Sequence, residues 1–400
     1  MKRIILLVAL LAFGLSASAQ TMKVQSAYAD LKNNRLANAK KNIDAACEHE
    51  NTKNDAKTWH YAGLIYAKIV EVSQTDEKLF KKQKIQTPVP ELAEISTQAI
   101  IKSLDLEKAA STTEYMKANI NTLKYIVGYQ FANAFDVFDK GGYAQSIPMF
   151  ENVSKVAQIA GDDEIRMKNN ACLALAYDAT GQKDKAAELY RQLVRQNTKE
   201  EAIYINLFLA NKRANENDKA INVLKAGVKN LPANYKLLGL LSGAYIENGN
   251  KEEADKCIAA LKAMADTISH DKPNVLVIIG NALRDANNTE EAIPMYNKSL
   301  ELNPNQTDAN LNLGILYFNW AVDLKDQADK LPIEAAEAYD KLQVESKSKF
   351  SVAIPYFEKV LTQKPNDIRA LNALKVIYSR LEMKEKYQEV SAKLESLRNK

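Results

Sequence analysis

Small and bulky apolar positions recur through the middle of the chain with a fixed spacing. Three alanines stand 34 residues apart, and a bulky apolar or aromatic residue follows each of them four positions later: Ala186 with Tyr190, Ala220 with Leu224, and Ala254 with Ile258. Helix-forming residues fill the space between them. A strict period of this length is typical of stacked helix-turn-helix units, none of which can bury its apolar face alone.

Each of these units also carries a turn signal at the same place. Gly181, Asn215 and Gly249 lie five residues before their alanines. Glycine and asparagine tolerate the left-handed backbone conformation that ends a helix. We therefore expect the chain to reverse direction at these three positions.

A second motif describes the first helix of a unit. The pattern W-x2-L-G-x2-Y is matched, with alanine in place of leucine, by Trp59, Ala62, Gly63 and Tyr66, and a further match comes from Asn310, Leu313, Gly314 and Tyr317. On these residues the chain resembles the tetratricopeptide repeat (TPR) proteins. The resemblance implies an all-α fold, a right-handed α-solenoid of about eight to nine TPR-like helix-turn-helix repeats.

Three proline-containing phrases support one repeated unit. Pro148, Pro294 and Pro355 each follow an isoleucine near the expected start of a second helix. A proline costs little in the first turn of a helix, where its missing N–H would have no partner. We therefore expect these helices to begin just before their prolines.

The N-terminal residues have the pattern of a secretory signal peptide. A charged start at Lys2 and Arg3 precedes an apolar run over 4–13, and Ala17-Ser18-Ala19 supplies small residues at a cleavage site. We expect an exported protein, periplasmic in a Gram-negative bacterium or secreted, with no membrane span after cleavage. Any association with the outer membrane would then come through a partner.

Two interruptions of the period suggest how the chain is divided. The second helix of the unit with Trp59 is delayed by an insertion near 71–95, and the alanine partner of Tyr317 is delayed by one near 320–350. We therefore expect a signal peptide over 1–19, N-terminal repeats with a helical insertion over 20–160, and C-terminal repeats with another over 161–400.

Charge and motif content exclude several functions. The chain has 54 basic and 50 acidic residues, for a net charge of +4, and lysines cluster only locally, so we expect no nucleic-acid partner. Phosphate-binding loops and zinc, redox or nucleophile motifs are absent from the sequence, which predicts no enzyme and no cofactor. The acidic run 162–164 precedes a helix and is expected to cap it rather than to act as an acid–base pair.

The sequence contains one cluster of possible metal ligands. Cys47, His49 and His60 could face one another as ligands, but three residues in a loop are a weak signal, and we predict no metal site. The favoured interpretation is a half-buried cysteine with two surface histidines. Cys172 and Cys257 are expected on helices of different repeats, as buried apolar residues rather than a disulfide.

The TPR resemblance implies a concave groove, lined by first helices, that binds a protein or peptide. The repeat frame selects as candidate partner-binding residues Phe131, Phe135, Asn206, Arg213, Asn281, Arg284, Asn312 and Arg369. The apolar members could equally pack between helices. Asn281 and Asn312 match two asparagines of the family's carboxylate clamp, but Val277 and Ala373 replace basic residues, so that clamp is not expected.

The resulting functional hypothesis is a non-enzymatic interaction scaffold or assembly factor in the cell envelope. One alternative is a component of an outer-membrane uptake system that captures a glycan or peptide, which would need an aromatic platform near an insertion. Another is a hydrolase with a site hidden between repeats. We expect the two insertions, more than the regular repeats, to carry the specific function.

Overall fold

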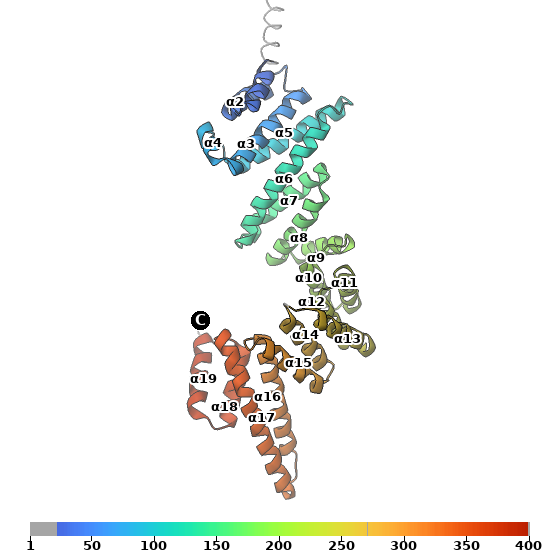
Figure 1. Cartoon of the computed structure of the whole chain (residues 1–400), viewed down its shortest axis with the longest axis vertical. Helices are drawn as coiled ribbons and strands as arrows, with labels where there is room; N and C mark the ends of the chain where they lie inside the picture. The colour runs from blue at the N-terminus through green and yellow to red at the C-terminus, as the bar shows by residue number, and fades with distance from the viewer. Residues whose placement is uncertain (1–21, 270, 399–400) are drawn as a thin grey trace, which may run out of the picture. The chain divides into compact units, whose positions relative to one another are not determined.

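The computed structural model describes residues 22–269 and 271–398, and helices account for most of this part of the chain (Figure 1). The predicted signal peptide and His270 lie outside the described residues. Following the helical residues 22–32, the first eight helices are α2 (Leu36–Glu48), α3 (Ala56–Thr75), α4 (Glu77–Gln83), α5 (Val89–Ala109), α6 (Met116–Asp139), α7 (Tyr143–Ala160), α8 (Asp163–Ala179) and α9 (Lys183–Arg195).

The backbone divides into two compact units, unit 1 up to Thr198 and unit 2 from Lys199. Unit 2 contains α10 (Glu201–Arg213), α11 (Asn217–Asn230), α12 (Tyr235–Glu247), α13 (Lys251–Thr267), α14 (Lys272–Asp285), α15 (Thr289–Leu302), α16 (Thr307–Asp329), the short 3-10 helix η1 (Ile333–Ala335), α17 (Ala336–Gln363), α18 (Ile368–Arg380) and α19 (Lys384–Arg398). The boundary expected between 160 and 161 rests on repeat regularity and stays a prediction.

Most hairpins share one turn geometry. The predicted left-handed turns are confirmed, with φ of 80° at Gly181, 59° at Asn215 and 77° at Gly249. Four further residues at the same place in their hairpins also have positive φ: Asn34, Gly141, Asn287 and Glu382. The two hairpins without this turn are α3/α5 and α16/α17, which are those that carry the insertions.

The small and bulky residues at the predicted spacing form the core of the hairpins. A small side chain of the second helix is fully buried in eight hairpins, and the bulky residue four positions later is buried with it: Ala39/Ile43, Ser96/Ile100, Ser146/Phe150, Ala186/Tyr190, Ala220/Leu224, Ala254/Ile258, Ala292/Tyr296 and Ala353/Phe357. Burying such side chains is the main favourable contribution to folding. The 34-residue pattern therefore reflects which side chains are buried between the two helices of each hairpin.

In three hairpins the bulky residue of the second helix contacts a glycine of the first. A Cβ atom built on Gly280 would lie 2.6 Å from Cε1 of Tyr296, and one on Gly314 would lie 2.9 Å from Cε1 of Phe357. At Gly63 the neighbour is Ile100 Cγ1, at 2.4 Å. The glycine of the first-helix motif thus lets the two helices approach closely.

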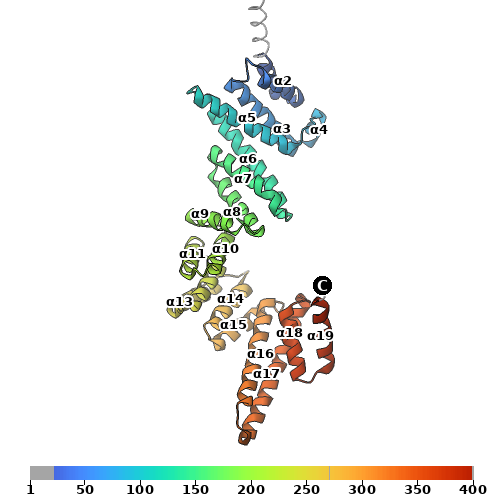
Figure 2. The same ribbon diagram turned by 180° about the vertical axis from the view of Figure 1, so that it is seen from behind.

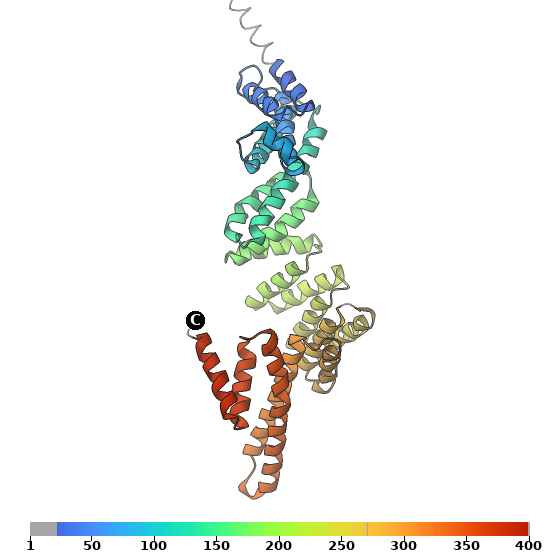
Figure 3. The same cartoon turned by 60° about the vertical axis from the view of Figure 1, so that its left-hand side comes forward.

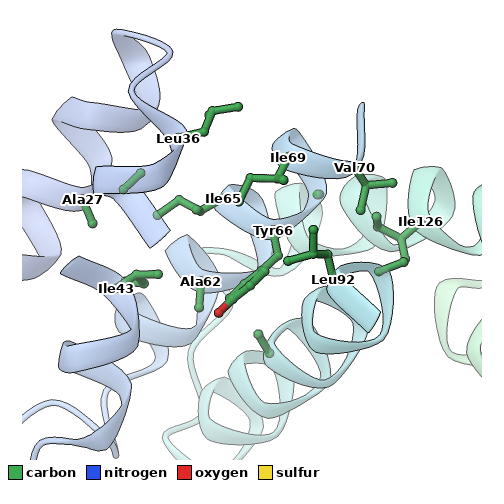
Figure 4. Packing of buried hydrophobic residues seen from close by; sticks show 14 of the residues in the cluster. Ala27, Leu36, Ile43, Ala62, Ile65, Tyr66, Ile69, Val70, Leu92 and Ile126 are labelled. Carbon is green, nitrogen blue, oxygen red and sulfur yellow. The ribbon is translucent and has the colours of Figure 1, made fainter. Parts of the chain in front are cut away.

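The core of the first two hairpins shows how neighbouring units share buried surface (Figure 4). Leu36 and Ile43 of α2 lie beside Ile65 and Tyr66 of α3, and Leu92 of α5 lies close to Tyr66 on its other side. All of these side chains are at most 5% exposed. Each helix therefore buries residues against more than one neighbour, as expected for stacked repeats.

The first insertion forms a short helix with a structural contact. Helix α4 packs beside α3 (Figure 2), and its last residue, Gln83, reaches the start of α2. The Gln83 Oε1 atom accepts a hydrogen bond from the backbone N–H of Ala37 at 3.2 Å, and its Nε2 atom donates to the Asn34 carbonyl at 3.2 Å. Gln83 therefore satisfies a helix-terminal N–H that would otherwise lack a partner.

The second insertion lengthens a hairpin. Helices α16 and α17 contain 23 and 28 residues, run side by side, and extend away from α18 and α19 (Figure 3). The inserted residues continue both helices, and η1 lies in the connection between them. The tip leaves Ile333 94% and Val344 69% exposed.

The proline positions differ from the expectation. Pro148 and Pro294 are the sixth residues of α7 and α15, and Pro355 lies in the middle of α17. In the helix interior a proline removes one hydrogen bond to the carbonyl four residues earlier. The expectation that these prolines occupy the first turn was wrong, because each helix begins earlier than the apolar pattern suggested.

These elements make the chain an all-α solenoid of helix-turn-helix repeats, as predicted. Within the described ranges, none of the helices is both long enough and apolar enough to cross a membrane.

Candidate functional site

Unit 2 contains a groove formed only by first helices of its hairpins. Its volume is about 480 Å³, and three consecutive first helices line it: α10, α12 and α14. We call it the unit 2 groove; its main lining residues are Ile205, Phe208, Gly239, Leu240, Gly243, Ile278, Asn281 and Arg284. A groove on this face was expected from the repeat frame, and two of the predicted residues, Asn281 and Arg284, line it.

Three predicted residues form one hydrogen-bonded group. Asn312 donates through Nδ2 to Oδ1 of Asn281 at 2.7 Å, and Arg284 donates through Nη1 to Oδ1 of Asn312 at 3.1 Å. The buried Tyr296 hydroxyl also donates to Asn281 Oδ1, at 2.8 Å. The side chains thus join α14, α15 and α16, and both oxygen atoms of the two asparagines are already used within the protein.

The other predicted residues of unit 2 lie outside this group. Asn206 is half-buried on α10, whereas the groove is lined by its neighbours Ile205 and Phe208. Arg213 is the exposed last residue of α10. Arg369, near the start of α18, is exposed and bonds the Asp367 carboxylate at 3.2 Å. These three residues do not line the unit 2 groove.

Phe131 and Phe135 belong to unit 1 and to an aromatic cluster of their own. Their ring centroids lie 6.1 Å apart on α6, and Phe131 lies 6.3 Å from the fully buried Phe150 of α7. Phe131 also packs against the buried cluster that contains Leu123. Phe131 therefore contributes to the core, as one alternative had allowed, while Phe135 remains 42% exposed.

Helix α12 supplies a part of the unit 2 groove that the predicted residues do not include. Gly243 lies eleven residues before Ala254, and Asn281 lies eleven residues before Ala292. Extending the frame from Asn281 would have found Gly243. A Cβ atom on Gly243 would meet nothing within 4 Å, so the glycine leaves the middle of the groove open.

Unit 1 has a larger pocket, of about 660 Å³, which the sequence did not predict. It is formed by helical residues 22–32, α3 and α6, again the first helices of consecutive hairpins. Its aromatic lining comes from Tyr28, His60, Tyr61 and Tyr125. The Tyr28 and Tyr61 rings lie 4.6 Å apart, and His60 stacks on Tyr115 at 4.5 Å. We call it the unit 1 pocket.

His60, one of the three candidate metal ligands, is buried and lies against Asn119. His60 is only 6% exposed, and its Nδ1 atom lies 2.8 Å from Oδ1 of Asn119. Burial lowers the pKa of His60, against the opposing effect of that hydrogen bond. The expectation of a surface histidine was wrong here, because α6 covers the ring. Nowhere in residues 22–269 and 271–398 do three or more His, Cys, Asp or Glu side chains form a group that could hold a metal ion.

Cys47 and Cys257 lie in apolar surroundings, and the acidic run before α8 caps that helix. Cys47 is half-buried against the core that contains Ile43, and burial raises its pKa to about 12. Cys257 of α13 is buried, with its pKa raised to about 11 for the same reason. Asp162 accepts a hydrogen bond from the Ile165 N–H at 3.0 Å, which confirms a helix cap at the acidic run before α8.

A row of nearly parallel rings lies at the base of the second insertion. The Tyr317 ring centroid is 5.9 Å from that of Tyr356 and 6.4 Å from that of Trp320, with interplanar angles of 5° and 9°. The Lys349 ammonium lies 3.5 Å from the Trp320 ring centroid, a cation–π contact. Trp320 is nevertheless 41% exposed.

Comparisons with known proteins agree with the repeat pattern. A family model described as TPR repeat matches residues 280–319, a stretch that includes α15 and two glycines that contact an aromatic ring of the second helix, Gly280 and Gly314. No curated protein matches the chain.

Three solved structures illustrate how distant the similar folds are. A tetratricopeptide repeat protein from Parabacteroides merdae is 17% identical, with 68% of this chain and 92% of that chain covered and a TM-score of 0.43. A monomeric mutant of IFIT1 with Gppp-AAAA is 16% identical, with 83% and 68% covered and a TM-score of 0.41. MamA is 21% identical, with 42% of this chain and 92% of that chain covered and a TM-score of 0.33. Similarity this distant carries no argument about function.

The matched unit is not isolated within the chain. Its glycine-on-aromatic packing occurs twice, at Gly280 and Gly314, and its buried small and bulky pair recurs in hairpins of both units. The family match over residues 280–319 and the recurring hairpin together make this chain similar to the tetratricopeptide repeat proteins.

Proposed function

We propose that this protein is a non-enzymatic scaffold that binds an extended segment of a partner protein in the unit 2 groove. The TPR fold in general suggests a protein-interaction scaffold. The observation that carries the proposal is the continuous lining of the groove by three successive first helices, α10, α12 and α14. An extended segment can cross several repeats at once on such a surface.

The lining also supplies the kinds of groups that such a segment needs. Ile205, Phe208, Leu240 and Ile278 offer apolar surface for alternate side chains of the segment. Asn281 uses its oxygen for Tyr296 and Asn312, which leaves its Nδ2 atom as a donor toward a ligand. A side-chain amide can donate to a backbone carbonyl without requiring a particular sequence.

We further propose that the protein acts as a scaffold or assembly factor in the cell envelope of a Gram-negative bacterium, or after secretion. The support for this location is the charged start, apolar run and small-residue site over residues 1–19. Fractionation of cells that express the full chain, with N-terminal sequencing of the product, tests it. A product that keeps Met1 and stays in the cytosol would contradict the proposal.

Filling the groove tests the binding site. Gly243→Trp places a large side chain in the groove without a clash at Cβ, and Gly128→Trp is a matched control in α6, where a Cβ also meets nothing within 4 Å. We expect a partner cross-linked to the wild-type protein in its native envelope to be lost with Gly243→Trp and kept with Gly128→Trp. Equal recovery of that partner with both variants would exclude the unit 2 groove.

The aromatic row favours a second candidate, capture of a glycan or peptide for an outer-membrane uptake system. Tyr317, Trp320 and Tyr356 form an aromatic surface beside the second insertion, as this alternative required. Calorimetry with oligosaccharides should give binding that Trp320→Ala abolishes and Tyr339→Ala, a change at a partly exposed tyrosine of α17, preserves. Absence of heat with the wild-type protein would remove glycans from this candidate.

A further inference from the structure

The unit 1 pocket has a different chemistry from the unit 2 groove. Three tyrosines, Tyr28, Tyr61 and Tyr125, line it together with the side chains of Lys32, Asn34 and Asn121. Its volume of about 660 Å³ lies within the range of roughly 300–1,000 Å³ found for ligand pockets. Aromatic walls with a few polar groups are the usual composition of such pockets.

The charges of the lining leave one cation without a carboxylate partner. Lys68 and Glu71 form an ion pair at 2.6 Å and so neutralise each other. Lys32 has no carboxylate partner among the described residues, and its ammonium lies 5.3 Å from the Tyr28 ring centroid. The charges of the lining side chains therefore sum to one positive charge beside an aromatic wall, and the Glu114 carboxylate, outside the lining, acts electrostatically on Tyr61.

The neutral polar groups of the pocket are mostly available as donors. Burial raises the pKa of Tyr61 and Tyr125, so both hydroxyls stay protonated at neutral pH. Within the described ranges, neither hydroxyl bonds another residue, and the side-chain amides of Asn34 and Asn121 are likewise unbonded. A ligand rich in acceptors and bearing negative charge would satisfy these groups and Lys32 together.

We propose that the unit 1 pocket is a second binding site, specific for an acidic peptide segment. A side-chain carboxylate of the segment pairs with Lys32, its apolar or ring side chains lie on Tyr28, Tyr61 and Tyr125, and Asn34 and Asn121 donate to its backbone carbonyls. This goes beyond the proposed function, because it assigns a separate site, in a separate unit, with selectivity for charge. It stands even if the unit 2 groove binds nothing.

An array of end-blocked random peptides tests the proposal with the full mature chain. Blocked ends remove the terminal carboxylate, so any acidic preference must come from aspartate and glutamate side chains. We expect peptides bound by the wild-type protein to be enriched in these residues and the enrichment to vanish with Lys32→Glu. It should persist with Lys102→Glu, a matched charge reversal at an exposed lysine of α5 outside the pocket.

Further arms separate this proposal from the alternatives. The acidic enrichment should persist with Gly243→Trp; its loss in that variant would move the site to the unit 2 groove and overturn the proposal. Added salt should weaken binding of the acidic peptides, because the Lys32 contact is partly solvent-exposed. No acidic enrichment, equal losses with both lysine variants, or displacement of the peptides by a neutral oligosaccharide would each overturn it.

Discussion

Asn312 donates its side-chain amide to the side-chain oxygen of Asn281 at 2.7 Å, from the first helix of one repeat to the first helix of the repeat before it. Both residues were predicted to bind a partner. The structure instead makes their contact part of the stacking between repeats, with Arg284 and Tyr296 completing it. A ligand can use what remains, both N–H groups of the Asn281 amide and the second N–H of the Asn312 amide.

Replacing Asn281 should therefore destabilise the fold as well as affect binding. In Asn281→Leu the Tyr296 hydroxyl, on a fully buried side chain, loses its acceptor, which costs about 1–3 kcal/mol. Urea denaturation followed by circular dichroism measures the loss. The control is Asn206→Leu, on α10 and half-buried, for which we expect little change. A midpoint equal to wild type for Asn281→Leu would argue against the structural role.

Two glycines of unit 2 should respond in opposite ways to the same substitution. Gly280→Ala forces a Cβ to within 2.6 Å of the Tyr296 ring and should cost about 1–3 kcal/mol. Gly243→Ala meets nothing within 4 Å and should stabilise α12 by about 0.5–1 kcal/mol, because alanine is the better helix former. Thermal unfolding of the two variants checks the sign; shifts in the same direction would contradict this packing.

Gln83 tests whether the first insertion supports the fold. Gln83→Ala removes the acceptor for the Ala37 N–H and the donor to the Asn34 carbonyl. We expect the free energy of unfolding to fall by about 0.5–2 kcal/mol, as for the loss of other helix caps. Gln86→Ala is the control, since the Gln86 side chain donates only to the nearby Lys84 carbonyl. Comparable denaturation midpoints for both variants would show that the α4 contact adds no stability.

His60 should make the fold sensitive to acid. Burial lowers its pKa below the ordinary value of 6.5, so the folded state favours the neutral ring. The contribution to stability is complete above about pH 6.5 and is lost as the pH falls, at up to about 1.4 kcal/mol per pH unit, because the unfolded chain binds the proton more readily. Denaturation midpoints at about pH 7 and pH 5 should differ more for wild type than for His60→Gln.

The matched control for that measurement is His49→Gln, a substitution at a partly exposed histidine. We expect this variant to keep the acid sensitivity of the wild type. If instead both substitutions flatten the pH dependence equally, burial of the His60 ring is not its cause.

The fold could be predicted from short stretches of sequence because each hairpin has the same arrangement of buried residues. The spacing from Ala186 to Tyr190 recurs wherever a small residue and a bulky one are buried together, and Gly181 identifies the turn. Helix starts were less predictable. Pro148 suggested a first turn, but α7 begins five residues earlier, at Tyr143, an exposed residue that lies outside the buried pattern.

The candidate sites could be predicted only in part. Asn281 and Arg284 line the unit 2 groove because a repeat frame fixes which face of a helix a position occupies. The unit 1 pocket was missed because its tyrosines come from three helices whose spacing the first insertion interrupts. No frame relates Tyr28 to Tyr125 across that interruption.

The turns that do remain intact have a practical value for engineering. Seven hairpins close with a single left-handed residue. The other two, α3/α5 and α16/α17, contain additional helical residues in this connection and still bury their pairs, Ser96/Ile100 and Ala353/Phe357. The entropic cost of closing a loop rises only slowly with the length of the loop. The connection after Gly181 is thus a natural attachment point for an epitope tag or fluorescent reporter, one that leaves the pocket and the groove untouched.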